Sequence, residues 1–167
     1  MRFMDLLERI NVHVGRAVAW LTLVMVLVTF VIVVMRYLFD SGWIWLQESV
    51  TWMHAAVFML AAAYTLAREE HVRVDIFYRR FTPRGRAFVD AAGALLLLIP
   101  VAVFIIFTSW DYVLISWQIR ESSREAGGLI YPFIPILKSL IPLMALMLLL
   151  QGAVLLVKSM QIIRANT

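Results

Sequence analysis

The chain has 167 residues, of which 63% are hydrophobic and 16% are charged, and its formal net charge is +4. Soluble domains average about 45–50% apolar and about 25% charged residues, so this composition excludes an ordinary water-soluble domain. Cysteine is absent, which excludes disulfides, iron–sulfur clusters, thiolate metal sites and thiol redox chemistry. The basic residues flank apolar segments, so they indicate membrane topology and phospholipid contacts rather than nucleic-acid binding.

The first 16 residues have the spacing of an amphipathic helix, with Phe3, Leu6, Ile10 and Val14 on one side. This pattern predicts a short interfacial helix over residues 2–14. The apolar run that follows is longer than the ~7–15 residues of a signal-peptide core, and no small-residue cleavage site follows it. We therefore expect an uncleaved signal anchor as the first membrane span.

Four segments carry no Asp, Glu, Lys or Arg, and each is long enough to cross a bilayer: Ala17–Met35, Ser49–Ala67, Ala91–Trp110 and Ser139–Val157. A helix of this length spans roughly 28–30 Å, the thickness of the hydrocarbon core. The sequence predicts an all-α integral membrane protein whose single domain, 1–167, is one compact bundle. Its four transmembrane helices are expected over about residues 15–36, 48–68, 90–111 and 137–158.

Small residues and prolines distinguish two of these helices. The second is rich in alanine, including the small-x-x-x-small pair Ala63 and Ala67, which predicts that protein surrounds it more than the other spans. The third contains Pro100, which predicts a kink. Between them, the sequence from Arg68 favours another interfacial helix that ends near Thr82-Pro83-Arg84-Gly85.

Basic residues are unevenly distributed between the two sides of the membrane. The two terminal segments and the second loop hold eleven of the fifteen, whereas the first and third loops hold only Arg36, Arg120, Arg124 and Lys138. The positive-inside rule therefore predicts that both termini are cytoplasmic. Short interfacial helices, four spans and this orientation complete the expected architecture.

The residues favour a helper subunit over an enzyme or a complete transporter. His54 is the only titratable side chain expected inside a span, and we interpret it as a hydrogen-bonded residue. His13 and His71 lie at another depth, which disfavours a bis-histidine haem. No metal, phosphate or dinucleotide motif is present, so we expect no cofactor and no enzymatic activity. A four-helix redox anchor resembling cytochrome b and a free-standing small transporter are the alternatives.

Two charged clusters flank the second span. Arg36 and Tyr37 precede it together with Trp45 and Glu48, and this cluster is either a weak surface ion pair with interfacial tryptophans or an anchor for a partner. His71 and Asp75 follow it at i, i+4 spacing, which favours a hydrogen bond between them if that turn is structured. The spacing alone indicates only a solvated helix end there.

In this order, the clusters resemble the small membrane subunit (DctQ-like) of tripartite ATP-independent periplasmic (TRAP) transporters. The chain departs from the pattern of this family at two places. Gln47 stands where a second carboxylate is frequent, and Leu143-Met144 stands where a small residue is expected. The resemblance covers nearly the whole chain, and the turn after the second span is its most specific part. The matching residues are Arg36, Tyr37 and Phe39, then Trp45 and Glu48, then Arg68, His71, Val74 and Asp75, and finally Gly127, Gly128, Ile141, Pro142, Leu150 and Gln151.

The resemblance implies a multi-pass protein of the bacterial inner membrane. It would scaffold a large membrane subunit (DctM-like) and help to dock a periplasmic solute-binding protein during sodium-coupled uptake of small organic anions. Arg36, Tyr37, Trp45 and Glu48 would then anchor the outer edge of the subunit interface. His71 and Asp75 would fix the inner turn, and Arg120, Glu121, Arg124 and Glu125 are candidate docking residues.

Overall fold

The structure, a computed structural model, describes residues 2–68, 78 and 80–165, with side chains from residue 9 onward. Its helices are α1 (Arg2–Leu38), α2 (Ile44–Ala67), α4 (Pro83–Gly93), the π-helical segment η1 (Ala94–Leu98), α5 (Ile99–Gln118) and α6 (Phe133–Ala165). The described part of the chain contains no strand. Four of its helical segments are long and apolar enough to cross a membrane, which confirms the predicted class of fold.

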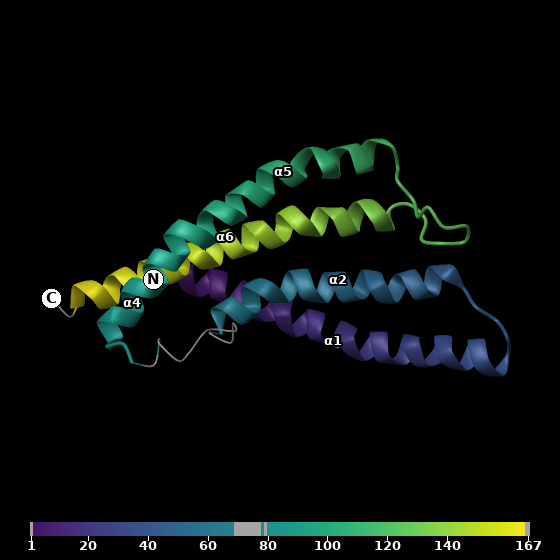
Figure 1. Cartoon of the computed structure of the whole chain (residues 1–167), viewed down its shortest axis with the longest axis horizontal. Helices are drawn as coiled ribbons and strands as arrows, with labels where there is room; N and C mark the ends of the chain where they lie inside the picture. Colours follow the sequence, from purple (N-terminus) through teal and green to yellow (C-terminus); the bar gives the residue numbers. More distant parts are fainter. Residues whose placement is uncertain (1, 69–77, 79, 166–167) are drawn as a thin grey trace.

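The first span and the predicted N-terminal helix form one continuous helix, α1 (Figure 1). No proline interrupts the junction, and Gly15, which is helical, lies directly against the Tyr64 side chain of α2. With 37 residues, α1 is about 55 Å long at ~1.5 Å per residue. It is therefore longer than the ~30 Å hydrocarbon core and must tilt or extend beyond it.

The third span is also longer than predicted, since α4, η1 and α5 join into one helix over Pro83–Gln118. Thr82 caps its start, because the Thr82 hydroxyl accepts a hydrogen bond from Gly85 N (3.2 Å) and Pro83 occupies the first turn. The Thr82-Pro83 motif thus begins this helix, and the interfacial helix expected before it falls largely outside the described residues. The π-helical turn η1 lies immediately before Pro100, where the proline ring would disturb regular α-helical hydrogen bonding.

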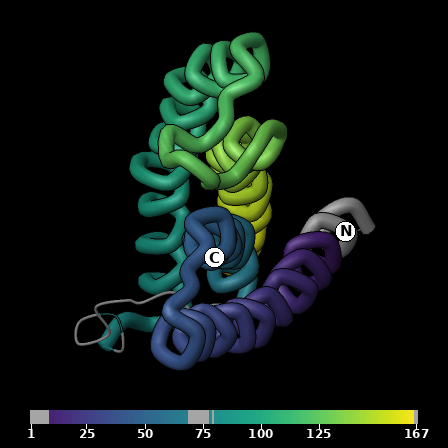
Figure 2. Tube along the Cα trace, turned by 90° about the vertical axis from the view of Figure 1, so that its right-hand side faces the viewer, coloured from purple at the N-terminus to yellow at the C-terminus, as the bar shows by residue number. Residues whose placement is uncertain are grey.

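The four spans lie side by side in the order α5, α6, α2, α1 (Figure 1). An end-on view shows α1 and α5 at opposite edges of this layer, so the spans form an open layer rather than the expected compact bundle (Figure 2). Because α6 contacts α1, α2, α4 and α5, it is the most buried span, with 33% of its most apolar stretch enclosed against 11% for α2. The prediction that α2 is the most surrounded helix was therefore wrong.

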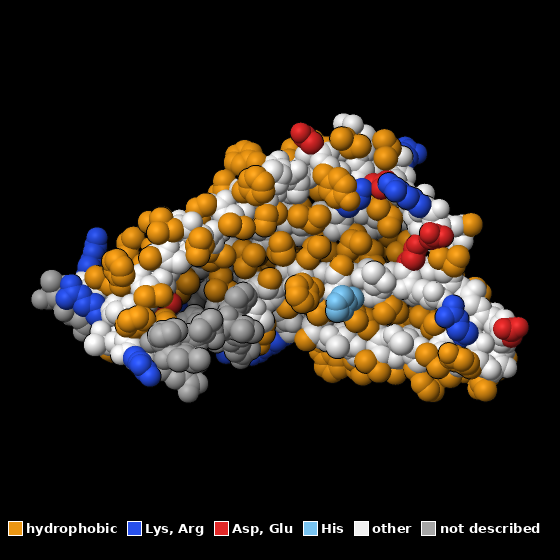
Figure 3. Space-filling model, viewed as in Figure 1, with side chains coloured by type: hydrophobic (Ala, Val, Ile, Leu, Met, Phe, Trp, Pro, Cys, Tyr) orange, Lys and Arg blue, Asp and Glu red, His pale blue; other side chains and the backbone are white. Residues whose placement is uncertain are grey.

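Apolar and charged side chains occupy different parts of the layer along its length. Apolar side chains cover the middle of the visible face, and charged side chains gather toward its ends (Figure 3). We call the end that carries residues 39–43 and 119–132 the loop end, and the end that carries both termini the terminal end. Near the terminal end, buried Asn11 on α1 donates from Nδ2 to Oε1 of buried Gln151 on α6 (3.0 Å), which joins two helices at an amide pair.

Candidate functional site

At the loop end, the Glu48 carboxylate holds the 119–132 loop against the first turn of α2. It accepts hydrogen bonds from Ser123 Oγ (2.5 Å) and from the Leu129 backbone N–H (2.6 Å). A second backbone contact runs from Trp45 N to Gly127 O (3.0 Å). Hydrogen bonds to an ionised carboxylate are stronger than those between neutral groups. The two hydrogen bonds that Glu48 accepts are therefore the main polar contact between α2 and this loop.

Two glycines allow the loop to approach Glu48. Gly127 has a φ of 79°, a left-handed conformation that side chains disfavour. A Cβ atom at Gly128 would lie 2.6 Å from Glu48 Oε2 and 2.5 Å from Ser123 Oγ. Gly127 is therefore required by the turn, and Gly128 by the close approach of the loop to Glu48.

Next to the contact between Glu48 and the loop lies an open, apolar groove of about 660 Å³. The groove is lined by Val24 and Val28 of α1, by Trp52 of α2, and by Leu129 and Phe133. The Trp52 indole N–H is already bonded to the Phe133 carbonyl (2.8 Å). This bond joins α2 to the start of α6 and leaves an apolar wall.

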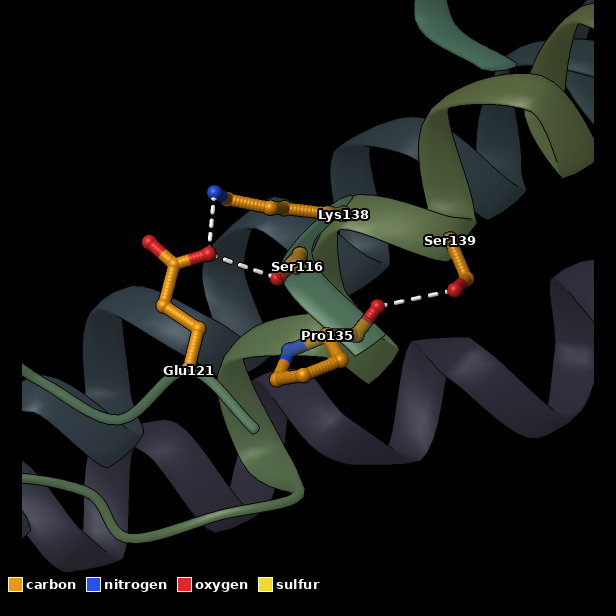
Figure 4. Close-up of polar contacts among 5 residues, drawn as sticks. All are labelled: Ser116, Glu121, Pro135, Lys138 and Ser139. Atoms are coloured by element: carbon orange, nitrogen blue, oxygen red, sulfur yellow. Dashed lines mark hydrogen bonds and ion pairs between the residues drawn. The ribbon is translucent and has the colours of Figure 1, made fainter. Parts of the chain in front are cut away.

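A second polar cluster joins α5 to α6 (Figure 4). Glu121 Oε2 accepts hydrogen bonds from Ser116 Oγ (2.6 Å) and from Lys138 Nζ (2.5 Å). The Lys138 ammonium also lies 4.0 Å from the centre of the Tyr112 ring, a cation–π contact. The hydrogen bonds from Lys138 and then from Ser116 lower the pKa of Glu121 below its ordinary value.

We expect this cluster to stabilise the fold at neutral pH and to weaken in acid. A lowered carboxyl pKa contributes stability above the unfolded-state value, and that contribution is lost as the pH falls through the lowered pKa. The Glu121 and Lys138 side chains are 21% and 16% exposed, so the Glu121→Gln variant should lose only about 1 kcal/mol at pH ~7. Thermal unfolding of the purified protein in detergent, from about pH 7 to about pH 3, should show wild type and variant converging in acid. An equal difference at every pH would contradict this role.

The structure places the predicted interface residues in two groups. Trp45 bonds to the loop through its backbone N–H and Glu48 through its carboxylate, although the Trp45 side chain is 49% exposed. Arg36 and Tyr37 are exposed at the end of α1, Tyr37 by 79%. Among the described side chains, Arg36 forms no ion pair with Glu48, whose carboxylate is occupied by the loop. His71 and Asp75 lie outside the described residues.

The four candidate docking residues also divide. Arg120, Arg124 and Glu125 are exposed on the 119–132 loop. Glu121 instead turns to Ser116 and Lys138 and is largely covered. The loop therefore presents three charged side chains to solvent. The fourth, Glu121, instead joins the start of the loop to Ser116 of α5 and Lys138 of α6.

His54 differs from its predicted state. Its imidazole is exposed on α2, with the Phe58 ring 6.3 Å away, and within the described ranges no hydrogen bond to it is formed. The expected hydrogen bond of His54 is thus absent from the chain's own described contacts.

Several residues at these contacts were not predicted. Ser123 and Ser116 bond to carboxylates, and the Asn11–Gln151 pair joins α1 to α6. A signal was available for both amides, since Asn11 precedes the first long apolar segment and Gln151 lies inside the fourth. Their pairing was not predictable, because 140 positions separate them.

Two comparisons with known proteins agree with this architecture. Residues 25–162 match the family model described as tripartite ATP-independent periplasmic transporters, DctQ component. A curated relative, the C4-dicarboxylate TRAP transporter small permease protein DctQ of Vibrio cholerae serotype O1, is 30% identical over 88 residues. That alignment covers 53% of this chain and 38% of the relative's length, so the chain spans well under half of the relative it matches.

The family match extends over most of the chain and includes parts of all four spans. It therefore agrees with the four long apolar helices. The chain belongs to the DctQ component family of TRAP transporters, and it is a multi-pass small transporter subunit of the bacterial inner membrane.

Proposed function

We propose that this chain is a non-catalytic scaffold for a large, DctM-like transport subunit, and that it helps a periplasmic solute-binding protein to dock. The transported solutes would be small organic anions, with C4-dicarboxylates the class suggested by the relative's name, and uptake would be coupled to sodium. The observation that carries the proposal is the division of the layer: its middle is apolar, and its charged side chains lie toward the ends of the spans. Substrate paths normally need several ionisable groups at membrane depth. His54 is the only histidine or charged side chain that the structure describes near the middle of a span, so we place the cargo site on another subunit.

The orientation follows from the basic residues. The terminal end, with most of the arginines, would face the cytoplasm, and the loop end would face the periplasm. The exposed residues Arg36 and Tyr37 would contact the large subunit at the outer edge. Trp45 and Glu48 would act by shaping the 119–132 loop, and His71 and Asp75 would fix the turn on the opposite side.

Co-purification tests the scaffold role most directly. When the chain is expressed with the other components of its transporter and extracted in mild detergent, a large membrane polypeptide should remain bound to it. The purified chain alone should show no Soret band and should transport no solute after reconstitution. A chain that purifies alone under every mild condition, or that moves solute by itself, would overturn the proposal.

Charge reversal of the exposed loop tests docking. Arg120→Glu or Arg124→Glu should lower the association rate of the solute-binding protein by roughly tenfold, because exposed charges steer encounter. Solute uptake should fall accordingly, while the membrane complex stays intact. Arg164→Glu, which reverses the charge of an exposed arginine at the terminal end, is the matched control. It should change neither the association rate of the solute-binding protein nor solute uptake. Normal uptake in both loop variants would place the docking surface elsewhere.

A further inference from the structure

One side of α2 combines apolar and polar side chains on the open surface of the layer. Thr51, His54 and Phe58 are all exposed there, and Phe58 is 76% exposed. Their spacing places them on the same side of the helix. We call these three residues the α2 face. Figure 3 shows a histidine exposed over α2 among apolar side chains.

The polar groups of the α2 face lack partners that other span residues have. Ser49, Thr65, Thr108 and Ser109 each donate a hydrogen bond to a carbonyl of their own helix. Asn11 and Gln151 bond to each other. By contrast, the residues with described side chains provide no hydrogen bond to Thr51 or His54.

This difference matters at the position of His54, near the middle of a helix long enough to cross the bilayer. Hydrocarbon offers no hydrogen bonds, so polar side chains in spans usually face protein or water. An imidazole left against lipid tails would remain unpaired. The α2 face is therefore better suited to contact with protein than with lipid.

We infer that the α2 face packs against a helix of the large transport subunit, which supplies a hydrogen-bonding group for His54. This inference rests on the proposed function, because that function provides the partner. The contact surface on the partner would be apolar around Phe58, with one hydroxyl, amide or backbone carbonyl opposite the imidazole. The multi-component character of the family favours a different subunit over a second copy of this chain.

Photo-crosslinking can test the location of this contact with a matched control. Phe58 on α2 and Phe107 on α5 are 76% and 77% exposed, so lipid should reach them equally in the isolated chain. p-Benzoylphenylalanine would replace either residue in the complete transporter, which is then irradiated in membranes. We expect an adduct with the large subunit from position 58 and little from position 107. A stronger adduct from position 107, a dimer of this chain, or lipid adducts alone from position 58 would overturn the inference.

Substitution of His54 tests the hydrogen bond itself. His54→Leu should weaken recovery of the large subunit in mild detergent by roughly 3- to 30-fold, the range expected for one hydrogen bond between spans. His54→Gln should retain most of the recovery because it keeps hydrogen-bonding groups. Thr108→Val is the control, since the Thr108 hydroxyl is already bonded to Phe104 O (2.8 Å).

The outcomes separate this inference from the proposed function. If the wild-type chain recovers no large subunit, the scaffold function fails. If the wild type recovers it and His54→Leu does so equally well, only the role of His54 fails.

Discussion

Replacing Glu48 with alanine is expected to release the 119–132 loop while the four spans stay folded. The change removes the acceptor for Ser123 Oγ and for the N–H of Leu129, which is only 8% exposed. A covered donor that loses a charged acceptor costs about 1–3 kcal/mol, so the two together should lower the free energy of local opening by about 2–3 kcal/mol. Such a loss corresponds to roughly 30- to 160-fold more of the open loop.

Limited trypsin digestion of the purified protein measures this opening, because Arg120 and Arg124 lie inside the loop. Cleavage after either arginine, followed by mass spectrometry, should accelerate by that factor in Glu48→Ala. Glu48→Gln should be intermediate, since its amide oxygen can still accept one bond. Glu125→Ala is the control, because it removes an exposed carboxylate from the same loop. An unchanged cleavage rate in Glu48→Ala would show that the backbone contacts alone hold the loop.

The Glu48→Ala variant also links the stability of the 119–132 loop to its proposed role in docking. If the loop is part of the docking surface, Glu48→Ala should reduce solute uptake without loss of the membrane complex. In that case the effect of Glu48 would be indirect, through the position of Arg120 and Arg124. A loss of the complex itself would instead assign Glu48 to the contact with the large subunit.

The four spans were predictable because length and apolarity are local properties of the sequence. Their ends were less so, since contacts with distant residues help to set them. For example, α2 begins at Ile44 rather than at residue 48, and the N–H of Trp45 bonds to Gly127 in another loop. The third span extends back to Pro83 because Thr82 caps it there.

The arrangement of the spans was not predictable from any one of them. The alanines of α2 indicated close packing, and Ala56 and Ala63 are indeed buried. Yet α6 is the central helix, because each of the other three spans contacts it. Likewise, Glu48 was a candidate from its position beside Trp45, but its partners lie 75 and 81 positions away. Local sequence identifies such a residue as unusual, and only the fold shows what it binds.

The helix pair α1–α2 provides the second large expected effect. Gly15 of α1 lies directly against Tyr64 of α2, and a Cβ atom added at Gly15 would be 2.6 Å from Tyr64 Cβ and 2.7 Å from Tyr64 Cδ2. These distances are far below van der Waals contact, so Gly15→Ala must push the two helices apart. Overpacking of this kind costs typically about 1–3 kcal/mol, and small residues are what allow helices to approach closely in membranes.

Gly93, a second helical glycine, provides a control for which a change in stability of the opposite sign is expected. Glycine in a helix is ordinarily less favourable than alanine by about 0.5–1 kcal/mol. A Cβ at Gly93, which is also helical, would meet nothing within 4 Å. Gly93→Ala should therefore stabilise the protein by about that amount, whereas Gly15→Ala should destabilise it. Both can be measured by denaturant titration in detergent micelles.

Removal of the whole Tyr64 side chain, Cβ included, should relieve the clash at Gly15. Tyr64→Gly alone should be destabilising, because it empties the contact between α1 and α2 and places a glycine inside a helix. In the Gly15→Ala/Tyr64→Gly double variant, however, the added methyl group fills part of the space that the tyrosine left. The two changes should therefore be clearly non-additive, with the double variant more stable than the sum of the single effects predicts. Additive effects would mean that α1 and α2 are not in contact at Gly15, and the order of helices in the layer would then have to change.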